Sequence, residues 1–306
     1  MIHSYNEWDA IREIVVGRAD FANWPGNDPV FARESEKTTW KETPVPDGPV
    51  PDWIIDEANE DLDMLAMVLE KCGATVHRPK ELNYQERGGM YGYCPRDRLL
   101  IYGDTIVDPA MMYPCRDMEI EALEEVIYRA DNIYRMPRDE GMILDAANVL
   151  RLNDTLLFLE SASGNIKAAR WLQNKLPDVN IEVCNFYSGV HIDSTIVPIR
   201  EGLVLVNASR VTAENLPKVF TGWDVIWIDE VVEQGFYKYP YASKWIALNM
   251  LVVDPSTIIV DKNQTKLIRI LEDYNMLVIP LELRHSRTLG GGFHCVTLDL
   301  VRKFNK

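Results

Sequence analysis

The sequence predicts an α/β protein in which one unit, a β-hairpin followed by a helix and a third strand, repeats around a closed ring. Hairpin-like segments recur about every fifty residues, and helical stretches and short apolar strands lie between them. Two strand-like segments at the ends of the chain could pair and complete a fifth unit. A fixed spacing of this kind indicates repeated supersecondary units.

Each predicted hairpin has two β-branched runs on either side of a polar or glycine turn, which is the usual hairpin signal. The four hairpins span Arg98–Asp108, Val149–Leu159, Thr195–Val206 and Met250–Val260. The predicted helices are Asp117–Arg129, Ser163–Leu176, Ala213–Lys218 and Ser243–Leu248. The third strands include Ile181–Cys184, Asp224–Ile228 and Met276–Pro280. The predicted order is therefore hairpin, helix, strand, four times over.

The two ends of the chain supply the hairpin of the fifth unit. Glu13–Gly17 and His294–Val301 are both strand-like, and their pairing would close the ring. A closed ring removes exposed sheet edges, which is a physical reason for such an architecture. The alternative is an ordinary α/β sheet in which the spacing is accidental, and the periodicity alone leaves that alternative open.

An irregular stretch at about residues 22–51, rich in proline, glycine and charge, stands where the first unit should have its helix. Insertions of this type are surface loops or substrate lids, and the sequence does not decide between them. A helix is predicted to follow over Asp52–Lys71, because Ile55, Leu62, Leu65 and Leu69 have helical spacing.

Composition excludes several functional classes. The chain has 306 residues, 47% of them hydrophobic, which is enough for a large core. Its formal charge of −15 would repel nucleic-acid phosphates and anionic lipids, whereas small cationic substrates remain compatible. No stretch approaches the roughly 18 apolar residues of a membrane span, and the first residues lack the layout of a signal peptide. We expect no nucleic-acid partner, no membrane association and a cytoplasmic location.

Cysteine usage points away from a structural role for these residues. The five cysteines are widely spaced and include no C-x-x-C pair: Cys72, Cys94, Cys115, Cys184 and Cys295. An odd number at such spacing indicates neither a disulfide framework nor a structural zinc site. At least one cysteine should be a free thiol.

Chemically capable residues stand at the same place in successive units, just before the hairpin. They are Asp97, Asp145, His191 with Asp193, Ser243 in the helix before the next hairpin, and Cys295 at the start of the closing strand. Equivalent positions in a ring of equivalent units converge on one axis. The sequence therefore predicts a single site built from residues that are far apart in the chain.

The segment Leu289–Cys295 joins three glycines to a histidine and a cysteine. Glycines let a backbone approach a ligand closely. A thiolate needs a base or a positive neighbour at neutral pH, and a histidine paired with a carboxylate provides one and can protonate a leaving amine. His191 and Asp145 fit these roles. His294 is adjacent to Cys295, but on a strand its side chain would point to the opposite face, so His191 is preferred.

Each of these residues also has a structural interpretation. A buried free cysteine is most often inert core, and a single histidine on a strand is most often structural. Gly290–Gly292 could form a flexible turn, and Asp145 could cap a helix. Taken singly, the signals are weak, and only their combination favours a catalytic site.

At these residues the sequence resembles the arginine amidinotransferases, which include the glycine and inosamine-phosphate enzymes, within the guanidino-group-modifying superfamily that also contains arginine deiminase. The matching segments follow the family's order: Ser4–Asp9, Ile14–Arg18, Pro95–Asp97, Asp145–Ala147, His191–Asp193, Ser243–Trp245 and Leu289–Cys295. The resemblance implies the pentein fold, a five-bladed pseudo-symmetric α/β propeller of ββαβ units. It also implies that residues 1–306 form one catalytic domain.

The resemblance further implies a role for each matching residue. Cys295 is similar to the family's nucleophile, His191 to its general acid/base, and Asp145 to the carboxylate that orients this histidine. No metal or organic cofactor is implied.

Four other residues resemble the family's substrate-binding positions. Asp97 and Asp193 correspond to the pair that holds the guanidinium group, a planar cation that suits bidentate carboxylates. Arg210 corresponds to the residue that pairs with the carboxylate of the donor, and Ser243 to a neighbour of the nucleophile.

The implied reaction moves the amidino group of L-arginine to a primary amine through an amidino-cysteine intermediate and releases ornithine. Glycine-specific relatives carry asparagine and methionine at the positions of Ser188 and Val190, so the sequence favours a wider cleft and a different acceptor amine. A hydrolase of the same superfamily, such as an arginine deiminase or dihydrolase, is the nearest alternative. A catalytically silent arginine-binding protein is a third, and a homodimer is an open possibility.

Overall fold

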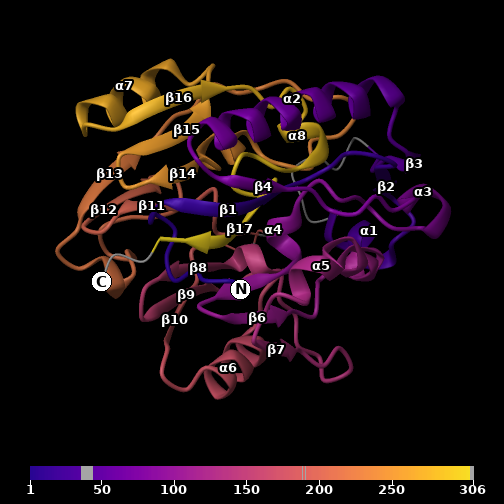
Figure 1. Cartoon of the computed structure of the whole chain (residues 1–306), viewed down its shortest axis with the longest axis horizontal. Coiled ribbons are helices and arrows are strands. Elements are labelled where there is room, and N and C mark those ends of the chain that lie inside the picture. The colour runs from indigo at the N-terminus through magenta and orange to yellow at the C-terminus, as the bar shows by residue number, and fades with distance from the viewer. Residues whose placement is uncertain (36–43, 188, 190, 304–306) are drawn as a thin grey trace.

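The computed structural model describes residues 1–35, 44–187, 189 and 191–303. Within them the strands form five three-stranded sheets and one two-stranded sheet. In each three-stranded sheet an antiparallel hairpin is joined by a third strand that runs parallel to its neighbour (Figure 1). This is the predicted five-bladed propeller of ββαβ units.

The five blades share one strand pattern, with the hairpin first and the parallel strand outermost. The first consists of β5 (Leu100–Tyr102), β6 (Thr105–Asp108) and β7 (Asn132–Arg135). The second consists of β8 (Val149–Leu152), β9 (Thr155–Leu159) and β10 (Asn180–Cys184). The third consists of β11 (Ile196–Arg200), β12 (Leu203–Asn207) and β13 (Asp224–Ile228). The fourth consists of β14 (Leu251–Asp254), β15 (Thr257–Asp261) and β16 (Leu277–Leu281). The fifth consists of β17 (Thr297–Arg302), β1 (Ile11–Val16) and β4 (Thr75–His77).

The fifth blade closes the ring as predicted, because β1 pairs with β17 in antiparallel register, with Val16 opposite Thr297. The predicted start of the closing strand at His294 was wrong, however. Phe293–Val296 form a turn in which the Val296 amide donates to the Gly292 carbonyl over 3.0 Å, and the strand begins only at Thr297.

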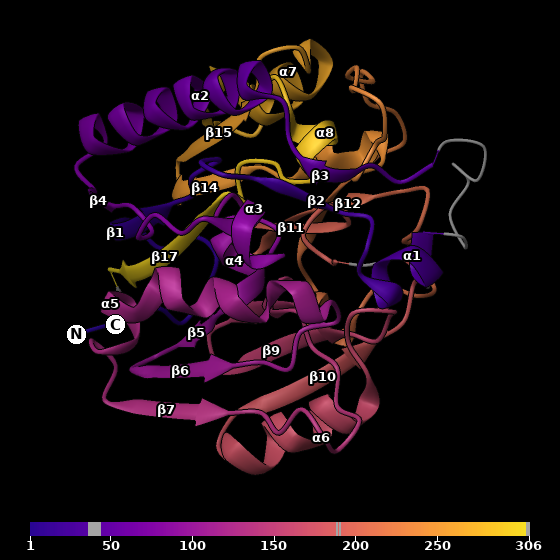
Figure 2. The same cartoon turned by 90° about the vertical axis from the view of Figure 1, so that its right-hand side faces the viewer.

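The helices lie at the periphery of the ring, with α2 and α7 on one side and α6 on the opposite side (Figure 2). They comprise α2 (Asp52–Lys71), the 3₁₀ helix η1 (Pro114–Leu123) followed by α5 (Glu124–Ile127), α6 (Ile166–Lys175), η3 (Lys218–Phe220) and α7 (Thr265–Asp273). No helix in the described part of the chain is both long enough and apolar enough to cross a membrane.

One helix prediction was wrong, and one helix was missed. Ala213–Lys218 contains turns rather than a helix, because a residue that precedes a proline, here Pro217, is disfavoured in the helical region. The fourth blade takes its helix from α7, which the prediction missed and which buries Leu267 and Leu271. Ser243–Leu248 is instead the 3₁₀ helix η4 (Lys244–Leu248), which precedes the hairpin.

The long helix α2 confirms the predicted span and packs on the fifth blade through an apolar stripe. Ile54, Leu62, Leu65 and Leu69 are each 0% exposed. Ile54 is fully buried on this face, and the predicted Ile55 is partly buried against the same core. The spacing of three or four residues places these side chains on one helix face.

The stretch at residues 22–51 is more ordered than predicted. It contains β2 (Asn23–Pro25), α1 (Pro29–Ser35) and β3 (Asp47–Pro49), and β2 pairs with β3 in antiparallel register. The ring of Phe31 on α1 lies 4.9 Å from that of Tyr113 and 5.4 Å from that of Tyr241. These contacts anchor α1 on two other segments of the chain.

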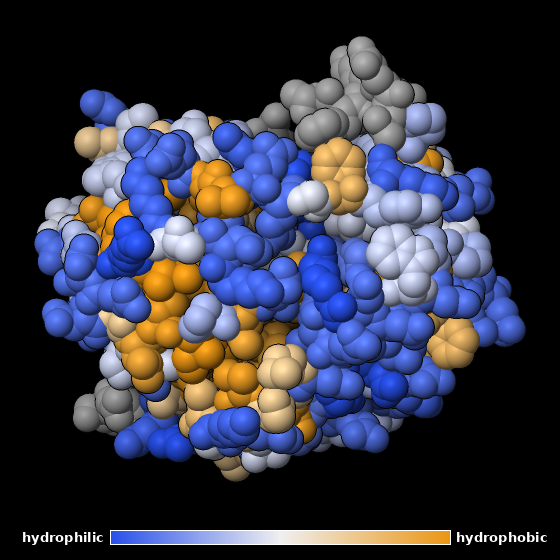
Figure 3. Space-filling model, turned by 90° about the horizontal axis from the view of Figure 1, so that it is seen from above, coloured by the Kyte–Doolittle hydropathy of each residue, from blue (hydrophilic) through white to orange (hydrophobic). Residues whose placement is uncertain are grey.

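Four further short helices complete the described elements: α3 (Tyr84–Arg87), α4 (Pro95–Arg98), η2 (Ala146–Asn148) and α8 (Ser286–Leu289). Seen from above, the molecule presents a largely hydrophilic surface with one area where hydrophobic side chains gather (Figure 3). Asp97, Asp145, Asp193 and Cys295 lie instead in the interior, at the segments that lead into the hairpins.

Candidate active site

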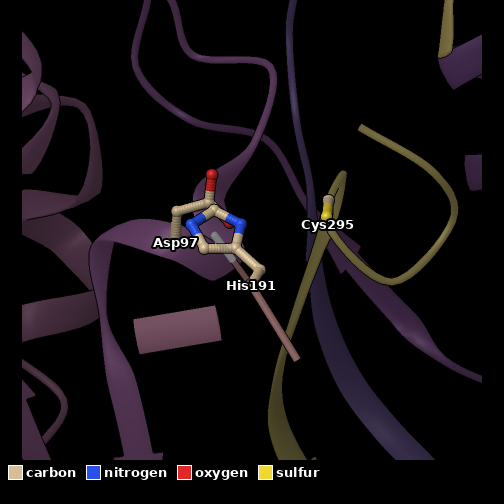
Figure 4. Close-up of side chains that lie close together, drawn as sticks. All are labelled: Asp97, His191 and Cys295. Carbon is tan, nitrogen blue, oxygen red and sulfur yellow. The ribbon is translucent and has the colours of Figure 1, made fainter. Parts of the chain in front are cut away.

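Three predicted residues from distant segments meet in one place. Asp97 lies on α4 before β5, His191 lies before β11, and Cys295 lies in the turn before β17. One ligand-type atom from each, an oxygen, a nitrogen and a sulfur, lies within 4.8 Å of the other two (Figure 4). The predicted convergence of equivalent positions is therefore present in the fold.

Glycines shape the backbone around Cys295, which is only 2% exposed. Gly290 ends α8 with a φ of 80°, a conformation that strains residues with side chains. A Cβ atom at Gly291 would stand 2.4 Å from the Cys94 Sγ and 3.3 Å from the Cys295 Cβ. The glycines therefore let the chain turn sharply and pack against the two thiols.

Asn249 holds the cysteine segment against the segment of His191, and its role was not predicted. Its Oδ1 accepts from the Cys295 amide over 2.9 Å, and its Nδ2 donates to the Asp193 carbonyl over 3.2 Å. Asn249 is 1% exposed, so these hydrogen bonds are shielded from water. They fix the position of the sulfur relative to Asp193.

His191 pairs with Asp145 as expected. Its Nε2 lies 3.1 Å from the Asp145 Oδ2, and the other Asp145 oxygen accepts from the Met112 amide over 2.9 Å. Asp145 precedes η2 but makes no capping hydrogen bond with its side chain, so the alternative of a helix cap is excluded. The second ring nitrogen, Nδ1, lies 3.6 Å from the Asp97 Oδ1.

The surroundings set the protonation states of the thiol and the imidazole. Burial alone would lower the pKa of His191, but Asp97, Asp145 and the contact with Cys295 raise it well above its ordinary value. The contact with the Cys94 thiol, burial and the charge of Asp193 raise the pKa of Cys295 well above its ordinary value, against the effect of His191. These shifts favour a protonated thiol beside a protonated imidazole in the resting site.

On one side of the thiol, Asp97 is backed by a buried ion pair. Its Oδ2 accepts from the Arg116 Nη1 over 2.7 Å, and the Arg116 Nε donates to both oxygens of Glu119 over 2.9 and 3.1 Å. Asp97 is 2% exposed, Arg116 3% and Glu119 4%. The Asp97 Oδ1 has no hydrogen-bond partner among the described residues and remains available to a ligand.

Asp193, a second carboxylate next to the thiol, is backed by a histidine. The Asp193 Oδ2 lies 3.3 Å from the Cys295 Sγ and 2.8 Å from the His294 Nδ1. The other ring nitrogen of His294 lies 3.3 Å from the Glu7 Oε2. Burial would raise the pKa of Asp193, but the hydrogen bond and charge of His294, with the charge of His191, hold it below its ordinary value.

The remaining predicted residues lie elsewhere or are not described. Arg210 stacks on the Tyr187 ring, 4.2 Å from its centroid, and its Nη1 donates to the Thr195 Oγ1 over 2.7 Å. The Tyr187 hydroxyl in turn donates to the His191 carbonyl, so Arg210 belongs to a group next to the thiol site.

Ser243 is exposed, and its Oγ accepts from the Trp245 amide over 3.3 Å as the cap of η4. Its hydroxyl is therefore engaged at the N-terminus of η4. The two predicted acceptor-pocket residues, Ser188 and Val190, lie outside the described residues.

The thiol site could bind either of two kinds of ligand. The oxygen, nitrogen and sulfur of Asp97, His191 and Cys295 form a set that could hold a metal ion. The two carboxylates that flank a thiol also suit a planar organic cation, since a guanidinium group presents donors on more than one edge. The second arrangement uses Asp193 as well, and it agrees with the net negative charge of the chain.

Comparisons with known proteins distinguish these uses. The scan of protein-family models found no match. The chain is 40% identical to an inosamine-phosphate amidinotransferase from Streptomyces griseus, and the match covers 99% of this chain and 97% of that protein. The chain belongs to the amidinotransferase family. The solved structure of an inosamine-phosphate amidinotransferase from this organism superposes with a TM-score of 0.93 at 38% identity and covers 100% of this chain and 98% of the other.

Family membership makes the chain a transferase, and further similarities agree with it. An L-arginine:L-lysine amidinotransferase from Pseudomonas savastanoi pv. phaseolicola is 29% identical over 98% of this chain and 94% of its own length. A dimethylarginine dimethylaminohydrolase from Pseudomonas aeruginosa shares the fold with a TM-score of 0.68 at 15% identity, covering 94% of this chain and 99% of that one. The pentein fold predicted for this amidinotransferase is thus confirmed.

Sequence reasoning missed the residues that back the two carboxylates. His294 was set aside because a strand would turn it away from Cys295, but the segment is a turn and both side chains contact the Asp193 Oδ2. Arg116 and Glu119 lie in a polar stretch that gives no local sign of burial. A charged pair spaced three residues apart next to a predicted site was the one available signal.

Proposed function

We propose that the protein transfers the amidino group of L-arginine to a primary amine, with Cys295 as the covalent carrier and residues 1–306 acting as one catalytic domain. The observation that carries the proposal is a buried thiol with Asp193 at 3.3 Å, Asp97 within 4.8 Å and the His191–Asp145 pair beside it. The relatives are named as amidinotransferases, including one that uses L-arginine. A guanidinium group between the two carboxylates would direct its central carbon at the sulfur.

The resting thiol becomes a nucleophile when the cation binds. Asp193 and Asp97 both raise the pKa of Cys295, behind the effects of the Cys94 contact and burial. A guanidinium group between them offsets both charges, so the thiol proton is released to solvent as arginine binds, because the protonated His191 cannot accept it. The thiolate then attacks the guanidinium carbon and forms a carbon–sulfur bond.

His191 carries the proton that the leaving group needs. As the bond between the guanidinium carbon and the ornithine nitrogen breaks, the imidazolium protonates that nitrogen and becomes neutral. Ornithine leaves, and an amidino group remains on Cys295. The acceptor amine then attacks the same carbon, His191 takes its proton, and the thiolate is expelled and regains a proton when the product leaves.

Two further parts of the proposal concern the donor and the location. Arg210 is proposed to pair with the donor's carboxylate, since its guanidinium lies in the group that Tyr187 and Thr195 connect to the His191 segment. The nucleophile has to remain a free thiol, which a reducing compartment favours, so we extend the proposal to a cytoplasmic location.

The acceptor is the least constrained substrate. Relatives are named for acceptors as different as inosamine phosphate and L-lysine, so membership of the family does not define it. The proposal is limited to the class of primary amines, with Ser188 and Val190 as candidate acceptor-pocket residues.

The test is incubation with arginine, with and without a panel of primary amines, followed by mass analysis of the products. Transfer predicts stoichiometric ornithine and guanidinylated amine that both depend on the acceptor. Citrulline, or urea with ornithine, formed at full rate without any amine would instead establish a hydrolase.

A further inference from the structure

Asp97 is held by only one of its two carboxylate oxygens. The Oδ2 accepts from the Arg116 Nη1 over 2.7 Å. The Oδ1 lies 3.6 Å from the His191 Nδ1 and has no hydrogen-bond partner among the described residues. The hydrogen bond to Oδ2 therefore sets the orientation of the carboxylate. The Oδ1 remains a free acceptor and lies toward His191 in the thiol site.

Arg116 is itself held in a fixed plane. Its Nε and Nη2 donate to Glu119 in a forked pair, with Nη2 to Oε2 at 2.9 Å, and Nη2 also reaches the Cys94 carbonyl at 3.4 Å. The guanidinium carbon lies 5.2 Å from the centroid of the Tyr91 ring. Forked contacts of this kind define the orientation of the whole guanidinium group. Arg116 therefore fixes where the Asp97 Oδ2, and with it Oδ1, can lie.

Stability alone does not account for this cluster. The desolvation cost of a buried ion pair offsets much of its Coulombic attraction, and packed apolar residues of similar volume often give the same stability. The open Asp97 Oδ1 is the atom of this cluster to which a bound cation can donate a hydrogen bond.

We propose that Arg116, held by Glu119, is a positioning residue that orients Asp97 to receive the guanidinium group of the donor. The inference rests on the proposed function and adds two residues from η1 to the machinery of arginine binding. Arg116 acts through Asp97 and does not touch the substrate.

The test compares three variants with a matched control. Arg116→Met removes the charge and the fork, Arg116→Lys keeps only the charge, and Glu119→Gln weakens the grip on Arg116. The control is Arg98→Lys, a buried arginine on α4 whose Nη1 donates to the Asp108 Oδ1 over 2.7 Å. The measurements are kcat and KM for arginine, the melting temperature, and calorimetric binding of arginine to each variant in a Cys295→Ala background.

Arg116→Met is expected to weaken arginine binding and raise KM by about tenfold to a hundredfold, the effect of losing a charge-assisted contact. Arg116→Lys should recover part of this loss, and Glu119→Gln should raise KM by a smaller factor. Arg98→Lys should lower the melting temperature but leave arginine binding within about twofold, because its hydrogen bonds go to the Asp108 side chain and the Asp117 carbonyl and lysine keeps its charge.

The inference is overturned if Arg116→Met and Arg98→Lys lower the melting temperature alike and neither changes KM or arginine binding. If Arg116→Met does not fold, Arg116→Lys and Glu119→Gln decide by the same criterion. A wild-type protein that neither binds arginine nor forms ornithine from it would refute the proposed function itself. An active wild type whose variants keep the wild-type KM and arginine affinity would refute only the inference.

Discussion

The two carboxylates beside Cys295 have the same charge and the same burial, yet different partners hold them. Asp97 is paired with Arg116 at 2.7 Å, a cation that stays charged at every accessible pH. Asp193 is paired with His294 at 2.8 Å, a group that can lose its charge. The comparison teaches that a permanently charged guanidinium stands behind Asp97, whereas an imidazole shared with Glu7 stands behind Asp193.

The geometry of His294 indicates which form is present. Its two ring nitrogens face the Asp193 Oδ2 at 2.8 Å and the Glu7 Oε2 at 3.3 Å. A neutral imidazole has a single N–H donor, so only the imidazolium satisfies both carboxylates. The Glu7 side chain also receives two nitrogens of Arg151, which keeps it in place.

The two flanks also differ in what they touch. Asp193 contacts the sulfur at 3.3 Å, whereas the free oxygen of Asp97 faces the Nδ1 of His191 at 3.6 Å. Both carboxylates are proposed to hold the guanidinium group, and beyond that Asp193 contacts the nucleophile whereas Asp97 faces the acid/base. Three predictions would break or sharpen this division.

The largest effect should come from removing either charge. Asp97→Asn and Asp193→Asn should each lower kcat/KM for arginine by about a hundredfold or more, because a buried charge-assisted contact with the cation is lost. Steady-state kinetics measure this. Loss in only one variant, with the other near wild type, would contradict the view that both carboxylates hold the guanidinium group.

An intermediate effect should distinguish Asp193 from Asp97 in the absence of substrate. The charge of Asp193, after the Cys94 contact and burial, raises the pKa of Cys295 more than that of Asp97 does. Asp193→Asn should therefore lower this pKa, increase the thiolate fraction at pH 8 and speed alkylation of Cys295 by iodoacetamide by about tenfold. Asp97→Asn should have a smaller effect, and equal rates in both variants would remove the distinction.

The smallest effect should appear in the pH profile of His294→Asn, in which asparagine keeps one donor for Asp193 but carries no charge. After burial, His294 and His191 are the charged groups that set the pKa of Asp193, which also faces the Cys295 thiol and the Asn249 amide.

The sign of the His294→Asn effect follows from the loss of a cation. Without it the pKa of Asp193 rises, so more of this carboxyl is protonated at low pH and the acid limb of kcat/KM moves to higher pH. Activity should fall several-fold near pH 6 and recover toward wild type near pH 8. An acid limb at the wild-type position would show that His294 only packs against Asp193.

The fold was predictable because its repeated turns leave local signatures. Asn153, Gly103 and Gly202 have φ angles of 61°, 60° and 82°, and residues of these types mark such turns in a sequence. The helix α7 was missed although Leu267 and Leu271 lie on one face of it. It has only nine residues, and the hydrophobic periodicity of so short a segment is a weak signal.

The site was predictable only in part. Cys295, His191, Asp145, Asp97 and Asp193 converge because the ring brings equivalent positions together. The backing residues Arg116 and His294 could not be inferred in the same way. One is a charged residue whose burial is purely tertiary, and the other was assigned to a strand that begins three residues later.

The covalent carrier is the central claim, and intact-protein mass spectrometry after brief exposure to arginine without an acceptor tests it most directly. We expect an adduct of about 42 Da, the amidino group in place of a proton, on the peptide that contains Cys295. Cys295→Ala should show no adduct and no turnover, whereas Cys72→Ala, which removes an exposed thiol, should behave as wild type. Turnover or an adduct that persists in Cys295→Ala would contradict the account.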